Sequence, residues 1–184
     1  MSSEKTYSDE VIEAWNKNPM MIPRIRKVTV NISIGQGGEK LVRIQDLLTQ
    51  LTGQRASLRV AKKTIRPFGI RKGENIATMV TLRGEKADAF LRKALEAVGY
   101  RLKRSSIDAF GNISFGISEY ILLPGAKYDP EIGIIGMDVA VTIERPGYRV
   151  ERKRIKRSRI PLRHRVKPEE TIALLTRDYG VTFV

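Results

Sequence analysis

The stretch KVTVNISI-GQGG-EKLVRIQDLLTQLTG, residues 27–53, decides the fold class of this chain. In its first eight residues, valine and isoleucine alternate with polar residues, which predicts a strand with one buried and one polar face. The glycine-rich turn at 35–38 leads into a helix from about 39 to 52, with apolar residues at helical spacing and Gly53 at its end. A half-buried strand followed by an amphipathic helix is typical of a domain that mixes both kinds of element.

The remaining sequence repeats these two kinds of segment. A short helix is predicted to begin at its N-cap Ser8 and to end at Asn18 and Pro19. Further strands are predicted at 56–61, 76–82, 112–121 and 137–144, and further helices at 84–98 and 168–179. The clean alternation of the strands indicates a sheet covered on one face only. We therefore predict an α+β fold of about five mostly antiparallel strands with helices packed on one face, in a single domain spanning residues 1–184.

The positive charge of the chain is concentrated in two segments. The sequence has 34 basic and 20 acidic residues, a net charge of +14. Seven basic residues and no acid lie between Arg55 and Gly73, and eleven basic residues with one acid lie between Arg145 and Lys167. The rest of the chain carries a net charge of −3. Segregation of this kind is typical of a protein that binds a polyanion.

The second basic segment, residues 145–167, is predicted to be an extension before the C-terminal helix. It is too basic and too poor in periodic apolar residues to join the core. Eight of its eleven cations are arginines, whose planar guanidinium suits bidentate contacts with phosphate and stacking on bases. The helix that follows it is predicted to carry Glu170 on its polar face.

Most catalytic and metal-binding chemistry is excluded by the residue inventory. The chain has no cysteine and one histidine, His164, so Cys–His catalysis and zinc sites fail. The turn at 35–38 lacks the third glycine of a dinucleotide-binding fingerprint, because Lys40 stands at that position, and no Gly-Lys dipeptide is present for a P-loop. No apolar stretch approaches the roughly 20 residues of a transmembrane helix. We expect a cytoplasmic protein with no cofactor, no metal and no membrane association.

The first basic segment has features beyond its charge. Lys62-Lys63-Thr64 stands at a strand end, where ammonium and hydroxyl groups can contact adjacent phosphates. In the loop that follows, Phe68 and Ile70 are either exposed for a partner or folded back over a sheet edge. The polar face of the first two strands lacks the aromatic pair with which an RRM stacks bases. Recognition should therefore depend on the backbone geometry and shape of a folded RNA.

A series of ordered segments carries a family resemblance. In the first half these are NPM (18–20), PRI (23–25), VNI (30–32), GQGGEKL (35–41), LTGQ (51–54), AKKT (61–64), FGIR (68–71) and VTLRG (80–84). In the second half they are GN (111–112), FGI (115–117), KYDPEIGI (127–134) and ERPGY (144–148). Over nearly its whole length the chain resembles the large-subunit ribosomal protein family conventionally numbered five, which eukaryotes number eleven. The basic segment after Pro146, the short termini and Gly37-Gly38 are similar to the archaeal type.

This resemblance implies a structural constituent of the large ribosomal subunit, not an enzyme. The family holds 5S ribosomal RNA in the central protuberance, beside other proteins of that region, and touches 23S ribosomal RNA. By similarity, the contacts with 5S ribosomal RNA are Asn31, Ser33, Gln36, Arg59, Lys62, Lys63 and Thr64. Contacts with other ribosomal RNA are implied at Arg152, Lys153, Arg154, Lys156, Arg157, Arg159, Arg163, His164 and Arg165.

The resemblance also implies two partners outside the large-subunit RNA. A family loop approaches the P-site tRNA, and by position it is the loop from Ile65 to Asn75. Its implied tRNA contacts are Arg66, Phe68, Gly69, Ile70, Arg71 and Lys72. The family bridges to a small-subunit head protein, and the loop from Lys127 to Ile135 is the candidate for that contact.

Two other functions stay open from the sequence. One is an RNA-modifying or nucleotide-using enzyme built around Gly35–Gly38, which would require a bound nucleotide or turnover. The other is a chromatin-type DNA binder, which should prefer duplex DNA over folded RNA.

Overall fold

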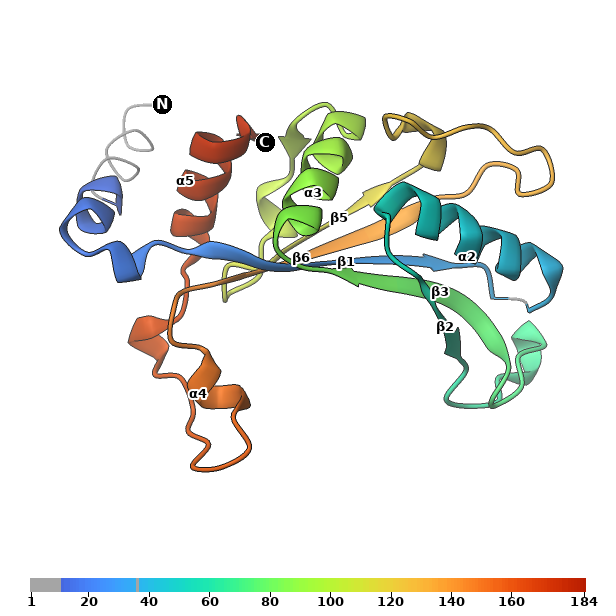
Figure 1. Cartoon of the computed structure of the whole chain (residues 1–184), viewed down its shortest axis with the longest axis horizontal. Coiled ribbons are helices and arrows are strands. Elements are labelled where there is room, and N and C mark those ends of the chain that lie inside the picture. Colours follow the sequence, from blue (N-terminus) through green and yellow to red (C-terminus); the bar gives the residue numbers. More distant parts are fainter. Residues whose placement is uncertain (1–10, 36) are drawn as a thin grey trace. The chain divides into compact units, whose positions relative to one another are not determined.

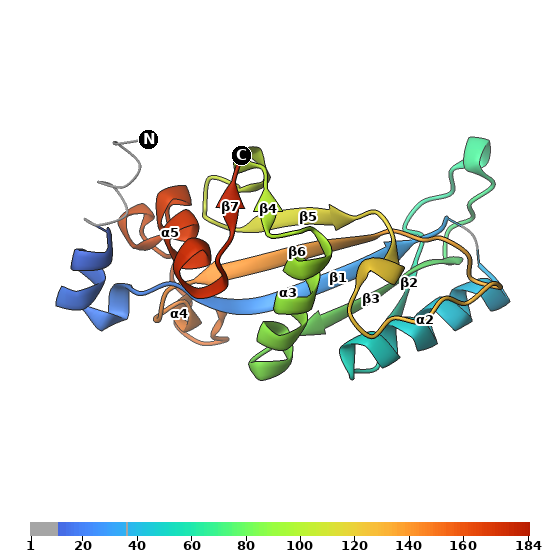
Figure 2. The ribbon, with the colours of Figure 1, turned by 90° about the horizontal axis from the view of Figure 1, so that it is seen from above.

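The computed structural model describes residues 11–35 and 37–184 and shows an α+β fold (Figure 1). Five strands form one antiparallel sheet in the order β2-β3-β1-β6-β5 (Figure 2). Their bounds are β1 Arg24–Ser33, β2 Ser57–Val60, β3 Asn75–Leu82, β5 Ile113–Ile117 and β6 Met137–Glu144. The predicted fold class is confirmed. None of the helices in the described part of the chain is both long and apolar enough to cross a membrane.

The chain divides into two compact units, each of which is described by itself. Unit 1 holds the described residues up to Arg26 together with Tyr100–Ser114 and Val141–Val184, and unit 2 holds Lys27–Gly99 and Phe115–Ala140. The helices α2 (Glu39–Thr52) and α3 (Glu85–Ala97) belong to unit 2. The C-terminal helix α5 (Pro168–Tyr179) and the basic extension belong to unit 1.

In unit 2 the two helices cover one face of the strands β1 and β3 (Figure 1). Val28, Val30 and Ile32 are buried on that face, as their alternation predicted. The buried apolar residues of the helices recur at helical spacing: Leu41, Ile44 and Leu48 in α2, and Ala87, Phe90, Leu91, Ala94 and Leu95 in α3. The helix α2 ends at Gly53, which has a φ of 62° and donates its N–H to the Thr49 carbonyl at 2.9 Å. This left-handed cap suits glycine, since a Cβ would strain it.

Unit 1 is built around α5. Pro168 fills its first turn and Gly180, with a φ of 67°, ends it. Trp15, from the helical segment 11–17, is buried, and the guanidinium carbon of Arg177 lies 5.1 Å from the centre of its ring. After the helix, the C-terminal strand β7 (Thr182–Phe183) pairs in parallel with β4 (Arg101–Leu102).

Several predicted boundaries differ from those in the structure. The strand β1 begins at Arg24, before the apolar alternation starts, because backbone pairing extends beyond the residues that face the core. The strand predicted at 112–121 ends at Ile117 and is followed by a 3₁₀ turn over Tyr120–Leu122. The two-residue strands β4 and β7 were not predicted, since a segment that short has no measurable period. The predicted N-cap Ser8 lies outside the described residues.

Candidate nucleic-acid interface

On one face of the sheet in unit 2, polar side chains of β1 and β2 flank β3, and the register of the strands aligns them. Asn31 of β1 pairs with Met79 of β3, which pairs in turn with Ser57 of β2. In the next row Ser33, Ala77 and Arg59 lie side by side. Because neighbouring strands are about 4.8 Å apart, the backbones at Ser33 and Arg59 are separated by about 10 Å. Three of the predicted RNA contacts therefore share one surface, whereas Gln36 lies outside the described residues.

The predicted Lys62-Lys63-Thr64 corner follows directly from β2. Main-chain bonds at Ala61 hold it in place: its N–H donates to the Glu74 carbonyl at 2.8 Å, and its carbonyl accepts from the N–H of Gly73 at 2.9 Å. All three corner residues are exposed. The Thr64 hydroxyl oxygen accepts the N–H of Lys72 at 3.0 Å, which leaves the hydroxyl proton available to donate. The corner thus presents two ammonium groups and one donor from a fixed backbone.

The loop beyond this corner is a structured hairpin. Ile65 and Ile70 exchange backbone hydrogen bonds of 2.9 and 3.2 Å, and Gly69, with a φ of 68°, completes the turn between them. Phe68 at the tip is 76% exposed, whereas Ile70 is half-buried. Of the two interpretations, exposure therefore holds for Phe68, and Ile70 is partly covered. The cations Arg66, Arg71 and Lys72 are exposed around the tip.

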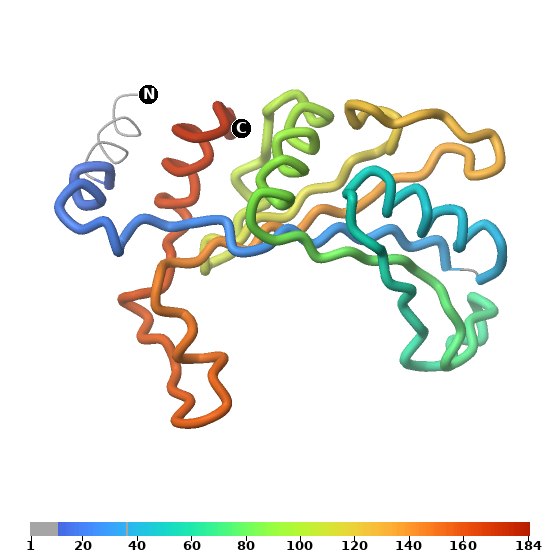
Figure 3. Tube along the Cα trace, in the orientation of Figure 1, coloured from blue at the N-terminus to red at the C-terminus, as the bar shows by residue number. Residues whose placement is uncertain are grey.

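In unit 1, the second basic segment leaves the end of β6 and returns to α5 as one excursion (Figure 3). Its two ends are joined by an ion pair between Arg145 and Glu170, both of which are buried. Glu170 also accepts the N–H of Lys167 at 3.0 Å. The prediction that Glu170 lies on a polar helix face is therefore wrong. The sequence pattern failed because the helix turns that residue toward a buried cation that periodicity does not detect.

His164 gives this excursion a second attachment. Its Nε2 lies 2.9 Å from the carbonyl oxygen of Pro146. Since a carbonyl can only accept, Nε2 carries the proton and donates. The imidazole also lies beside the ring of Tyr148, with 5.9 Å between the ring centres, and burial raises the pKa of the Tyr148 phenol above its usual value. The geometry gives His164 a structural contact in addition to its predicted contact with RNA.

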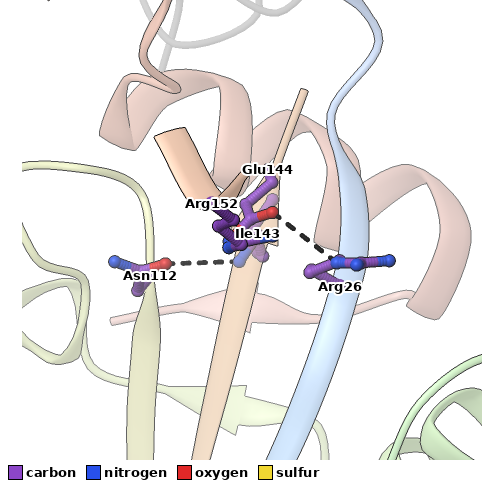
Figure 4. A network of polar contacts seen from close by, with 5 residues as sticks. All are labelled: Arg26, Asn112, Ile143, Glu144 and Arg152. Carbon is purple, nitrogen blue, oxygen red and sulfur yellow. Dashed lines mark hydrogen bonds and ion pairs between the residues drawn. The ribbon is translucent and has the colours of Figure 1, made fainter. Parts of the chain in front are cut away.

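Glu144, at the end of β6, connects three parts of unit 1. Its carboxylate forms ion pairs with Arg152 and, at 3.8 Å, with Arg26 (Figure 4). Arg152 belongs to the helical turn α4 (Arg149–Arg152), which was not predicted within the extension. The hydrogen bond to Glu144 raises the pKa of Arg152 above its ordinary value, so its guanidinium stays charged. Sequence reasoning missed Glu144, although it is the acid that directly precedes the basic segment.

Most of the other cations of the extension are exposed. The exposed side chains predicted to contact RNA are Arg152, Lys153, Arg154, Lys156, Arg157, Arg159 and Arg163, whereas Arg165 is half-buried. Ile160 and Val166 are buried and anchor the returning part of the segment. The charge available to a polyanion is smaller than the sequence suggested, because Arg145 is buried and paired.

Metal and nucleotide chemistry receive no support from the described residues. Among them, no group of three or more histidine, cysteine or acidic side chains could hold a metal ion. An open cavity of about 630 Å³ lies between α2 and residues 124–132 of unit 2, and its lining includes Arg43, Lys93 and Tyr128. None of the turn residues Gly35, Gly37 and Gly38 lines that cavity, so it does not supply the pocket that the enzyme hypothesis requires.

Comparison with known proteins gives matches across most of the chain. The family described as "Ribosomal protein L5" matches residues 18–71, and the family that describes the C-terminus of the same ribosomal protein matches residues 75–174. The chain is 64% identical over 176 residues to the large ribosomal subunit protein uL5 of Aeropyrum pernix. These residues cover 95% of this chain and 92% of the relative.

Other archaeal relatives give the same result. The protein of that name from Sulfurisphaera tokodaii is 54% identical over 173 residues, 94% of this chain and 98% of the relative. The one from Methanococcus vannielii is 47% identical over 175 residues, 94% of this chain and 97% of the relative. On the sequence segments, the fold and these matches, the chain belongs to the ribosomal protein L5 family.

Proposed function

We propose that this chain, a structural protein of the large ribosomal subunit and not an enzyme, binds 5S ribosomal RNA through unit 2. The proposed contacts are Asn31, Ser33 and Arg59 on the polar sheet face, Gln36, which follows β1 in the sequence, and the Lys62-Lys63-Thr64 corner. The observation that carries the proposal is the alignment of polar residues of β1 and β2 on one sheet face, with a fixed cationic corner after β2. Such a surface can follow a folded RNA backbone without reading single-stranded bases.

We further propose that the basic extension attaches the protein to 23S ribosomal RNA, so that 5S ribosomal RNA is held on the subunit in the central protuberance, beside the other proteins there. Nine exposed cations on an anchored excursion support this role. Through these two interfaces, the protein would bind both RNAs in the cytoplasm, where ribosomes work.

The test is capture of the RNA that this protein binds. The full chain is incubated with total RNA of its source and with duplex DNA of the same length as 5S ribosomal RNA. Sequencing of the bound fraction should show that 5S ribosomal RNA is retained in preference to the DNA. With about 6–10 phosphate contacts, affinity should fall about 10³–10⁵-fold between 50 and 200 mM salt. A preference for duplex DNA, or binding that ignores salt, would reject the proposal.

The hairpin tip is proposed to contact the P-site tRNA through Arg66, Phe68, Gly69, Ile70, Arg71 and Lys72. An aromatic residue that is 76% exposed, beside three exposed cations, supports this contact. Replacing Phe68 and Arg71 together with serine should weaken tRNA binding in the P site of assembled ribosomes roughly tenfold, because the variant can make neither the stacking interaction nor the phosphate interaction. Binding of 5S ribosomal RNA to the isolated chain should not change.

The matched control replaces Val42 and Lys40 with serine, which removes one exposed apolar and one exposed basic side chain from α2. That variant should leave both activities at the wild-type level. If the Phe68 and Arg71 variant instead loses 5S ribosomal RNA, the hairpin tip belongs to the 5S surface.

The loop from Lys127 to Ile135 is proposed to meet a small-subunit head protein. An ion pair from Arg43 to Glu131 and a 2.9 Å bond from the N–H of Asp129 to the Tyr120 hydroxyl hold the loop, while Tyr128 and Ile134 are exposed. Because the chain has no cysteine, Tyr128→Cys supplies a unique thiol for a cross-linker. Assembled ribosomes should yield a product with a small-subunit protein; products with large-subunit proteins alone would contradict the contact.

A further inference from the structure

We propose that Phe110 and Arg165 form a stacking platform that receives one unpaired nucleobase of the ribosomal RNA bound by unit 1. This inference rests on the proposed function, and it adds a contact of a different kind. The cations of the extension bind phosphates, whereas the platform would bind a base. Unstacked RNA bases commonly stack on aromatic rings and on arginine planes.

The geometry of the two side chains is that of a cation–π pair. The guanidinium carbon of Arg165 lies 4.5 Å from the centre of the Phe110 ring. Phe110 nevertheless remains 46% exposed. A planar guanidinium covers at most one face of the ring, so the rest of the ring stays open to a ligand. Here close to half of an apolar surface faces solvent, beside a segment built to attract RNA.

The turn that carries Phe110 is fixed without help from the ring. The carboxylate of Asp108 accepts the N–H groups of Phe110 and Asn112, each at 2.8 Å, and the Asn112 side-chain amide, also at 2.8 Å. The Asn112 side-chain oxygen accepts the N–H of Ile143 in β6 at 3.3 Å (Figure 4). The backbone therefore holds the ring in its exposed position before any ligand arrives, which lowers the entropy cost of binding.

Gly111 locks the same turn against α5. Its φ is 74°, and its carbonyl accepts the hydroxyl of Thr171 at 2.7 Å. A Cβ at this position would lie 2.6 Å from that hydroxyl oxygen and 2.8 Å from a methyl carbon of Val166. The close approach joins the turn to the residue that directly follows Arg165. Both members of the platform are thus positioned by one packed contact.

The experiment measures binding of the full chain to deproteinised 23S ribosomal RNA over a range of salt concentrations. Phe110→Leu keeps apolar bulk and removes the π face, whereas Phe110→Trp keeps the π face. The leucine variant should lose affinity roughly tenfold at every salt concentration, as expected for one base–aromatic stack. The slope of log affinity against log salt should not change, since stacking releases no counterions. The tryptophan variant should bind like the wild type.

Tyr100→Leu is the matched control, because it removes another exposed ring from unit 1. It should bind like the wild type. The melting temperatures of the Phe110 variants should agree with that of the wild type because the turn does not depend on the ring. If Phe110→Leu binds like the wild type while wild-type binding depends on salt, the platform is rejected and the proposed function stands. If the wild type itself shows no salt-dependent binding, the proposed function fails and the platform fails with it. Equal losses in the Tyr100 and Phe110 variants would also overturn the platform.

Discussion

Replacing Lys62 and Lys63 together with glutamate should weaken binding of 5S ribosomal RNA about 1,000-fold at low salt. At 50 mM salt, counterion release makes each phosphate contact worth about 15-fold in affinity, so removing two of them accounts for about 200-fold. Two new negative charges facing phosphates add the rest through repulsion. Both lysine side chains are exposed and main-chain bonds hold the corner, so the fold should be unaffected. A gel-shift titration with 5S ribosomal RNA measures the effect.

The salt dependence of this variant gives a sharper test than affinity alone. The slope of log affinity against log salt should become shallower by about 2, one unit for each lysine that no longer neutralises a phosphate. The matched control is Lys40→Glu with Lys93→Glu, which makes the same change in net charge on exposed positions of α2 and α3. If the control weakens binding as much as the corner variant, net charge governs binding and the corner is not a site.

The main elements of the fold follow from the sequence because their patterns are long. The helices at 39–52 and 168–179 and the strand at 137–144 have the predicted bounds. Each helix combines a clear apolar period with a residue that marks one of its termini: Gly53 ends the first, and Pro168 begins the second. What a single period cannot show is which strands are neighbours. The order of the five strands depends on pairing between segments far apart in the chain.

The candidate site was predictable to a similar degree. That Asn31 and Ser33 face away from the core follows from the strand period, whereas their alignment with Arg59 depends on a register that only the structure gives. The exposure of the cationic corner agrees with its composition. The contacts that hold the basic extension were not predictable. They join Arg145 to Glu170 and His164 to Pro146, and such pairs have no local sequence signature.

The buried pair at the base of the extension leads to the largest expected change in stability. Replacing Arg145 with methionine should lower the free energy of unfolding by about 3–5 kcal/mol, because the buried carboxylate of Glu170 is left without its counter-charge. For a chain of 184 residues this corresponds to a melting temperature lower by about 10 °C. Trp15, the single tryptophan, is buried in unit 1, which also contains Arg145 and Glu170. Its fluorescence therefore reports the unfolding of that unit.

Arg26→Met is the matched control for this prediction. The side chain of Arg26 is 53% exposed, and its Nε lies 3.8 Å from the Glu144 carboxylate. Solvent screens a pair of that kind, so the variant should cost less than about 1 kcal/mol. If both variants lose a similar amount of unfolding free energy, burial of the Arg145–Glu170 pair does not increase its contribution to stability.

Replacing both partners separates stability from positioning. Two buried nitrogens of Arg145, Nε and Nη1, have no hydrogen-bond partner among the described residues, so the native pair itself carries a desolvation cost. The double variant Arg145→Met with Glu170→Leu should therefore be as stable as the wild type to within about 1 kcal/mol, the cost of removing the cap at Lys167. If the pair serves to fix the extension, this stable variant should still bind 23S ribosomal RNA less tightly. Wild-type affinity in a stable double variant would mean that the remaining contacts of the extension position it without the pair.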